Sequence, residues 1–179
     1  MPATPAGTEV VEHEIWVAAR PETVFSFFTD PMKMIQWMGI QATLDPRPGG
    51  VCRIRFRPRR AVIDFWQSAL GLQREPPGVA ETGVVMSGEF VAIDPPKRIS
   101  LTWGWEQELF ATPPQTTAVE VSFTPDDSGT LVRLAHRRLH AAAVEFHRNG
   151  WGHYLPRLAL VAAGRDPGPD PLEASTKEN

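Results

Sequence analysis

The chain of 179 residues is long enough for one domain with a substantial core or an enclosed cavity. Its net charge of −3 gives no electrostatic reason to expect nucleic-acid binding. The single cysteine, Cys52, excludes a framework of internal disulfides. No apolar run approaches the ~20 residues that span a bilayer, and residues 1–8 lack the features of a secretory signal. We therefore expect a cytoplasmic protein with no membrane span.

The first part of the chain predicts one strand followed by two short helices. Residues 10–18 alternate between apolar and polar side chains, as in a half-buried strand. Pro21 suits the first position of a helix, and apolar side chains over 24–28 recur at helical spacing. Asp30 and Pro31 repeat this signal as an N-cap and a first-turn proline. A second short helix is therefore expected directly after the first.

Residues 51–57 show the clearest alternation in the sequence. Cys52, Ile54 and Phe56 share one face, and the other face carries Arg53, Arg55 and Arg57. This pattern is typical of an antiparallel strand with one buried face. The arginines indicate either cross-strand pairing with acids such as Glu89 or a docking patch for an acidic partner. Exposed aromatic side chains do not alternate with these arginines, so we expect no nucleic-acid partner.

Residues 58–83 interrupt the strands with a predicted helix. Apolar side chains recur at helical spacing over 62–70, and Gly71 follows as a stop signal. Long insertions of this kind are often functional. We expect Phe65 and Trp66 on the apolar face to form a lid over a cavity; the alternative is an interface with a second copy in a homodimer.

Four further strands and a long final helix complete the predicted domain, at about 84–93, 98–106, 117–124, 130–137 and 142–163. A single domain is therefore expected over residues 9–165. The segments 1–8 and 166–179 are expected to be flexible tails because they are rich in proline, small residues or charge.

Several segments appear together in an order that resembles the START-like helix-grip superfamily: 21–25, 30–37, 48–50, 88–103 and 150–158. Within it, the chain is similar to bacterial proteins related to the activator of Hsp90 ATPase. The resemblance implies an α+β helix-grip fold, with a curved antiparallel β-sheet wrapped around a long C-terminal α-helix and two short helices after strand 1. It also implies a hydrophobic cavity between sheet and helix. The helical insert between strands 3 and 4 departs from the usual short hairpin. Relatives include lipid carriers, cyclases and co-chaperone domains, so no single function follows.

Bulky side chains on the predicted inner faces are the candidate ligand-binding residues. Trp103 and Trp105 share a strand face with Ile99 and Leu101. Tyr154 combines an apolar body with a polar tip that suits ligand orientation. Packing in the core is the alternative role for each member of the set, which is Trp37, Met38, Phe90, Trp103, Trp105, His136, Trp151, Tyr154 and Leu155.

His136 is the most informative polar candidate. It alternates with Val132 and Leu134, which turns it inward, and a buried imidazole needs a hydrogen-bond partner. It is either a hydrogen-bonded core histidine or a group that orients a ligand or transfers protons. If the protein is an enzyme, His136 and Tyr154 are the expected acid–base residues.

The sequence predicts no metal and no cofactor. His147 and His153 are six residues apart and would face different sides of a helix, and no HExxH or CxxC motif occurs. No GxGxxG or Walker pattern supports nucleotide binding. There is no GxSxG motif, and Cys52 points inward as an inert thiol. Glu106 and Glu108 are either rim carboxylates or part of a solvated strand end.

Three functions remain compatible with these observations. The first is binding of a small apolar or amphipathic molecule in the cavity. The second is a cyclase, dehydratase or hydrolase acting on an aromatic or polyketide-like substrate, which would need a shifted pKa in a dry pocket. The third is a co-chaperone-like interaction with a partner protein through the 58–83 insert.

Overall fold

The computed structural model describes residues 7–57, 83–107 and 116–171. The predicted insert helix with Phe65 and Trp66, as well as Glu108, lies outside the described residues. Among the described residues, no helix is both long and apolar enough to cross a membrane.

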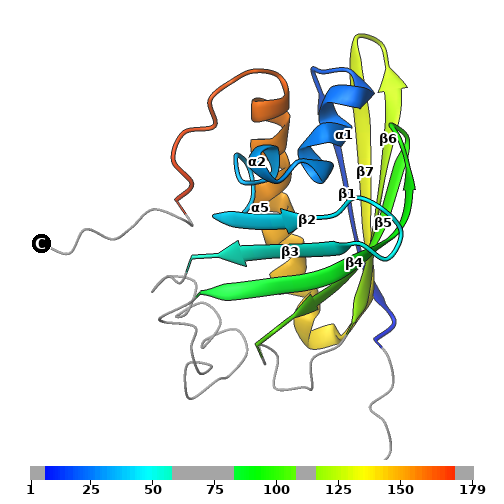
Figure 1. Ribbon diagram of the computed structural model, residues 1–179, viewed down its shortest axis with the longest axis vertical. Coiled ribbons are helices and arrows are strands. Elements are labelled where there is room, and N and C mark those ends of the chain that lie inside the picture. Colours follow the sequence, from blue (N-terminus) through cyan, green and yellow to red (C-terminus); the bar gives the residue numbers. More distant parts are fainter. Residues whose placement is uncertain (1–6, 58–82, 108–115, 172–179) are drawn as a thin grey trace, which may run out of the picture.

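One seven-stranded antiparallel sheet curves around the C-terminal helix (Figure 1). Its strand order is β1-β7-β6-β5-β4-β3-β2, so the first strand pairs with the last and every other pair is consecutive in the chain. The predicted α+β helix-grip architecture is therefore confirmed. The strands are Glu9–Val17, Gln41–Leu44, Val51–Phe56, Val84–Asp94, Arg98–Trp105, Thr117–Asp126 and Gly129–Leu139.

Helices cover the concave face of this sheet. Helix α1, Pro21–Thr29, and α2, Pro31–Met34, follow β1, while a 3₁₀ turn, Ala141–Ala143, leads into α5, Val144–Ala162. Helix α5 crosses the inner side of the sheet in Figure 1. Helix α2 ends at Met34, and residues 35–38 continue as a hydrogen-bonded turn.

The core lies between the sheet and these helices. Strand alternation buries one side chain in two, as in β7, where Val132, Leu134 and His136 are all buried. Trp151, Leu155 and Leu158 of α5 meet them from the other side. The concave face therefore supplies both the core and the surroundings of any internal site.

The start of α2 depends on Asp30. Its Oδ1 accepts hydrogen bonds from the backbone N–H groups of Met32 and Lys33, at 2.9 and 3.4 Å. Replacing Asp30 by alanine leaves these donors without a cap, so we expect the free energy of unfolding to fall by ~1 kcal/mol. Urea denaturation measures this change. Asp30→Asn preserves the cap and is the control; equal losses in both variants would contradict the capping role.

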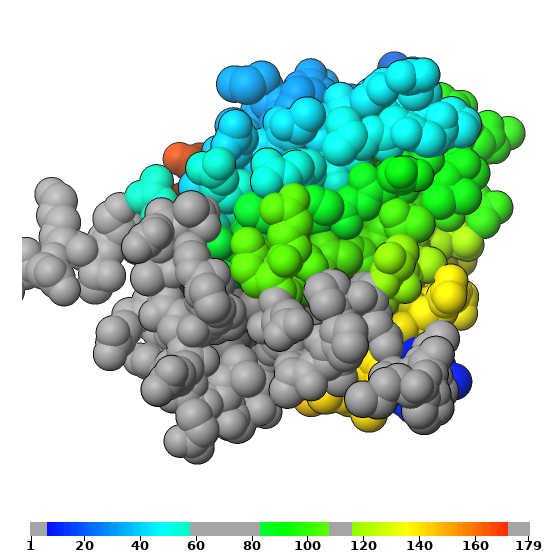
Figure 2. All heavy atoms as spheres, turned by 60° about the horizontal axis from the view of Figure 1, so that its bottom comes forward, coloured from blue at the N-terminus to red at the C-terminus, as the bar shows by residue number. Residues whose placement is uncertain are grey.

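Figure 2 shows neighbouring strands as successive bands, from cyan β2 and β3 to green β4 and β5. Arg53 of β3 pairs with Glu106, through Nε–Oε1 at 2.8 Å and a second contact at 3.1 Å. Glu89, the acid expected to pair with the arginines, lies opposite Val51 in the register, which leaves Glu106 as the partner of Arg53. The pair is a surface contact, and Ser87 also donates to Glu106.

Candidate functional site

The histidine–tryptophan cluster lies where the last residues of β5 and β7 meet the first turns of α5. It consists of Trp103, Trp105, His136, His147 and Trp151. Strands β5 and β7 and helix α5 each contribute to it. The ring centroids of Trp103 lie 5.0 Å from Trp151, 5.7 Å from His136 and 5.9 Å from Trp105. The structure therefore brings together four of the predicted ligand-binding residues.

His136 is completely buried, and both of its ring nitrogens are hydrogen-bonded. The indole Nε1–H of Trp151 can only donate, so Nδ1 of His136 accepts this bond at 3.1 Å. The proton of the neutral ring is consequently assigned to Nε2, which lies 2.6 Å from Oγ1 of Thr117. The Thr117 hydroxyl then donates to the backbone carbonyl of Trp103, at 2.9 Å. Every group in this chain of bonds is satisfied when His136 is neutral.

His147 is the second buried histidine, and it was not among the predicted site residues. Its Nε2 accepts a hydrogen bond of 3.1 Å from the indole of Trp105, so its Nδ1–H donates to the Ala143 carbonyl at 2.8 Å. The rings of His136 and His147 are 4.5 Å apart between centroids. His147 precedes Trp151 by four residues, so both side chains lie on the same face of α5. This spacing is the sequence signal that could have identified His147 as an inward-facing residue.

Burial keeps both histidines neutral. It lowers the pKa of His147 from 6.5 to about 4, partly offset by the bond to the Ala143 carbonyl. Burial, and then the proximity of His147, lower the pKa of His136 well below 6.5. Protonation of His136 would place an N–H on Nδ1, facing the indole N–H of Trp151. Both groups are donors, so the hydrogen bond between them would be lost. The geometry therefore fixes these rings as neutral hydrogen-bonding groups.

A rim of three less buried aromatic side chains borders the cluster. Phe56, Trp105 and Tyr154, here called the aromatic rim, are each only partly buried. The centroid of Phe56 lies 5.7 Å from Trp105 and 5.8 Å from Tyr154. These three rings belong to β3, β5 and α5, so the rim lies where the sheet faces the helix.

Trp103 carries a polar group that the cluster does not use. Its side chain is buried, and its indole Nε1–H has no hydrogen-bond partner among the described residues. A buried donor without an acceptor costs about 1–3 kcal/mol. The Trp103 N–H is therefore an unused donor that has already lost its hydration.

The remaining predicted site residues lie elsewhere in the core. The Trp37 ring packs 5.0 Å from that of Phe28, and its Nε1–H donates to the Phe27 carbonyl at 3.1 Å. Met38, Phe90 and Leu155 are buried in the same continuous core. Their packing is compatible with the core role that the sequence left open, and Trp37 and Met38 also line a hollow beside the α2–β2 connection.

Other candidate groups are explained by local contacts. Burial raises the pKa of Cys52 to about 12, so its thiol stays protonated and unreactive at neutral pH. Hydrogen bonds from Arg53, then from Ser87, lower the pKa of Glu106, which keeps it an ionised surface partner. Within the described parts of the chain, no three His, Cys, Asp or Glu side chains are grouped so as to hold a metal ion.

Residues 18–163 match the family described as Activator of Hsp90 ATPase homolog 1-like protein. An AHSA1-like protein from Rhizobium etli, whose solution structure is known, is 34% identical, with 96% of this chain and 92% of that chain covered and a TM-score of 0.62. Among curated proteins, none matches this chain.

Two more distant solved structures share the fold. CalU16 from Micromonospora echinospora is 22% identical, with 91% of this chain and 80% of that chain covered and a TM-score of 0.57. DynU16, a protein in the dynemicin biosynthetic locus, is 18% identical, with 88% of this chain and 48% of that chain covered and a TM-score of 0.64. At these identities the likeness concerns the fold alone.

Proposed function

Because this chain belongs to the Activator of Hsp90 ATPase homolog 1-like family, we propose that it binds a small, largely apolar molecule between the sheet and α5, at the aromatic rim. The observation that carries the proposal is the combination of partly buried rings with the unpartnered Trp103 donor behind them. An aromatic ligand that bears a carbonyl or ether oxygen fits both features. Ring stacking supplies the apolar contact, and the oxygen accepts from Trp103.

The apolar contact dominates the binding energy. Removal of apolar surface from water contributes roughly 25 cal/mol per Å², before the cost of immobilising the ligand. The rim rings also need little ordering, since Phe56 already packs against both Trp105 and Tyr154. A preorganised site of this kind keeps more of the burial energy as affinity.

The cyclase-like alternative is less well supported by this geometry. Proton transfer needs a group with a free lone pair or a transferable proton near the substrate. His136 and His147 use both ring nitrogens in internal hydrogen bonds. The co-chaperone-like alternative depends on the 58–83 insert, most of which lies outside the described residues, and it stays a prediction.

An uncharged fluorescent probe, N-phenyl-1-naphthylamine, tests the proposed site. We expect saturable binding to the wild-type protein and at least a tenfold weaker affinity for Trp105→Ala, since truncating one buried aromatic contact costs about 1.4 kcal/mol or more. Trp16→Ala is the matched control, because Trp16 is 46% exposed on β1 and donates to the Asp126 carbonyl. Equal affinities of both variants and wild type would contradict binding at the rim.

A further inference from the structure

A hollow lined by the α2–β2 connection has a different chemistry from the aromatic rim. Its volume is about 350 Å³, within the range of small-molecule sites. Residues 35–40 line it together with three charged residues, Arg57, Arg157 and Asp170. Its lining contains neither Trp105 nor Tyr154, so it is separate from the aromatic rim.

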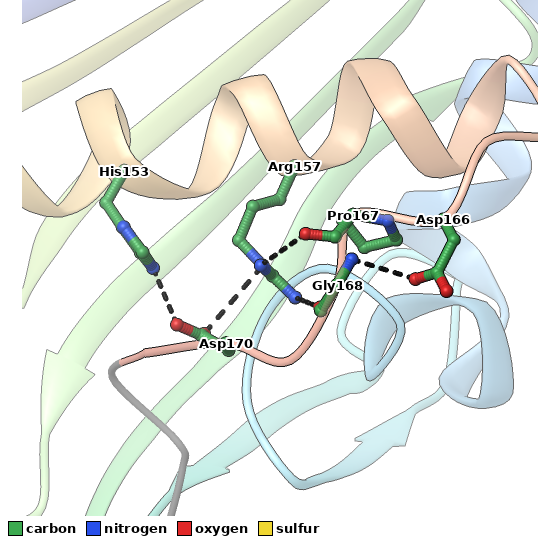
Figure 3. A network of polar contacts seen from close by, with 6 residues as sticks. All are labelled: His153, Arg157, Asp166, Pro167, Gly168 and Asp170. Atoms are coloured by element: carbon green, nitrogen blue, oxygen red, sulfur yellow. Dashed lines mark hydrogen bonds and ion pairs between the residues drawn. The ribbon is translucent and has the colours of Figure 1, made fainter.

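One charged lining residue, Asp170, belongs to a strap, residues 166–170, that runs back along α5 (Figure 3). The Arg157 guanidinium donates to the carbonyls of Pro167 and Gly168, at 3.4 and 3.0 Å. Asp170 lies beneath the helix with Oδ1 at 2.8 Å from Nε2 of His153. These contacts fix the strap and hold the Arg157 side chain, which is only 13% exposed, at the wall of the hollow.

Arg157 is incompletely satisfied in this arrangement. Its Nε makes no hydrogen bond to any described residue, and the nearest carboxylate oxygen, Oδ2 of Asp170, is 3.9 Å away. An arginine that recognises a carboxylate normally does so through hydrogen bonds shorter than 3 Å. Asp170 instead directs Oδ1 to His153. The guanidinium therefore retains a donor for an additional acceptor.

The rest of the lining indicates what that acceptor belongs to. Among the described residues of the lining, arginine outnumbers the acidic side chains by two to one, which favours an anion. Ile35, Trp37 and Ile40 add apolar side chains to the same lining, and the hollow is partly open to solvent. We propose that this hollow binds a small carboxylic acid, with its carboxylate at Arg157 and its hydrocarbon part against the 35–40 turn.

Hexanoate is the test ligand and 1-hexanol its uncharged counterpart, titrated into ¹⁵N-labelled protein. The NMR signals to follow are the Arg157 Nε–H, identified by its loss in Arg157→Lys, and the indole N–H of Trp37. We expect saturable shifts of both signals with hexanoate, and at least about tenfold weaker binding of hexanol, which lacks the charge-assisted hydrogen bond.

Three variants separate a carboxylate site from a purely structural network. Asp170→Asn removes the competing negative charge and is expected to strengthen hexanoate binding. Ile40→Trp fills the hollow without touching the charges and is expected to abolish binding. Arg148→Gln removes an arginine of the same helix that pairs with Glu145 outside the hollow, and should leave the affinity unchanged.

The opposite results overturn the proposal. Equal binding of hexanol and hexanoate, or weaker hexanoate binding in Asp170→Asn, would show that the carboxylate is not recognised there. Shifts confined to the indoles of Trp103, Trp105 and Trp151 would place hexanoate at the aromatic rim, which would support the proposed function and refute this site. Absence of saturable binding would refute it as well, while leaving the probe result at the rim unaffected.

Discussion

Replacing His136 by leucine is expected to lower the free energy of unfolding by about 3 kcal/mol, although leucine fills a similar volume. The substitution leaves the Trp151 indole N–H without its acceptor and removes the donor to Thr117 inside a dry core. A buried polar group that loses its partner costs about 1–3 kcal/mol, and two groups are affected here. Urea denaturation followed by circular dichroism measures the loss.

A double-mutant cycle isolates the cause. His136→Leu leaves the Trp151 indole N–H without an acceptor, and Trp151→Phe removes that N–H. The loss of unfolding free energy in the double variant should therefore be smaller than the sum of the two single losses. His13→Leu is the control, because His13 is only partly buried and its ring makes a single hydrogen bond among the described residues, to the Arg148 carbonyl at 3.1 Å. Strict additivity in the cycle would show that the hydrogen bond of His136 to Trp151 contributes nothing.

Stability should fall steeply as the pH decreases from 6.5 toward 4. The folded state keeps His147 neutral down to about pH 4, whereas the unfolded chain protonates it near 6.5. Unfolding therefore takes up protons in this window, and each such histidine lowers the free energy of unfolding by about 1.4 kcal/mol per pH unit. His136, whose pKa is also lowered, acts in the same direction. The stability that comes from keeping the two histidines neutral is fully present above pH 6.5 and is lost as the pH falls below it.

Urea midpoints at pH 7.5, 6, 5 and 4.5 measure this dependence. His147→Leu removes one of the two titrating groups, so its stability should decline with about half the slope between pH 6 and 5. A wild-type stability that is constant between pH 6.5 and 5 would mean that neither imidazole is held neutral by the fold.

Much of the fold could be predicted because its signals are local. Residues 51–57 alternate strictly, and the structure buries Cys52 and Ile54 on the side predicted. Asp30 precedes a proline at a helix start, and its side chain caps α2. Inward alternation of His136 with Val132 and Leu134 is likewise borne out by their burial. In each case a period of two or a capping signal determines the outcome within a few residues.

Contacts between distant segments could not be predicted in the same way. The bond between Trp105 and His147 joins residues 42 positions apart, and the pairing of Arg53 with Glu106 depends on the register of three strands. Nothing in residues 166–171 indicated that Asp170 would lie against His153 and Arg157. Such contacts follow from how the sheet curves and where α5 ends, which no short pattern encodes.

The central claim is that a small, largely apolar molecule occupies the aromatic rim. Native mass spectrometry of protein purified from the cells that naturally produce it, followed by denaturing extraction, tests it most directly. We expect a stoichiometric small-molecule adduct on the wild-type protein that is lost in Trp105→Ala and retained in Trp16→Ala. A wild-type protein that carries no adduct and co-purifies with a second protein would contradict it.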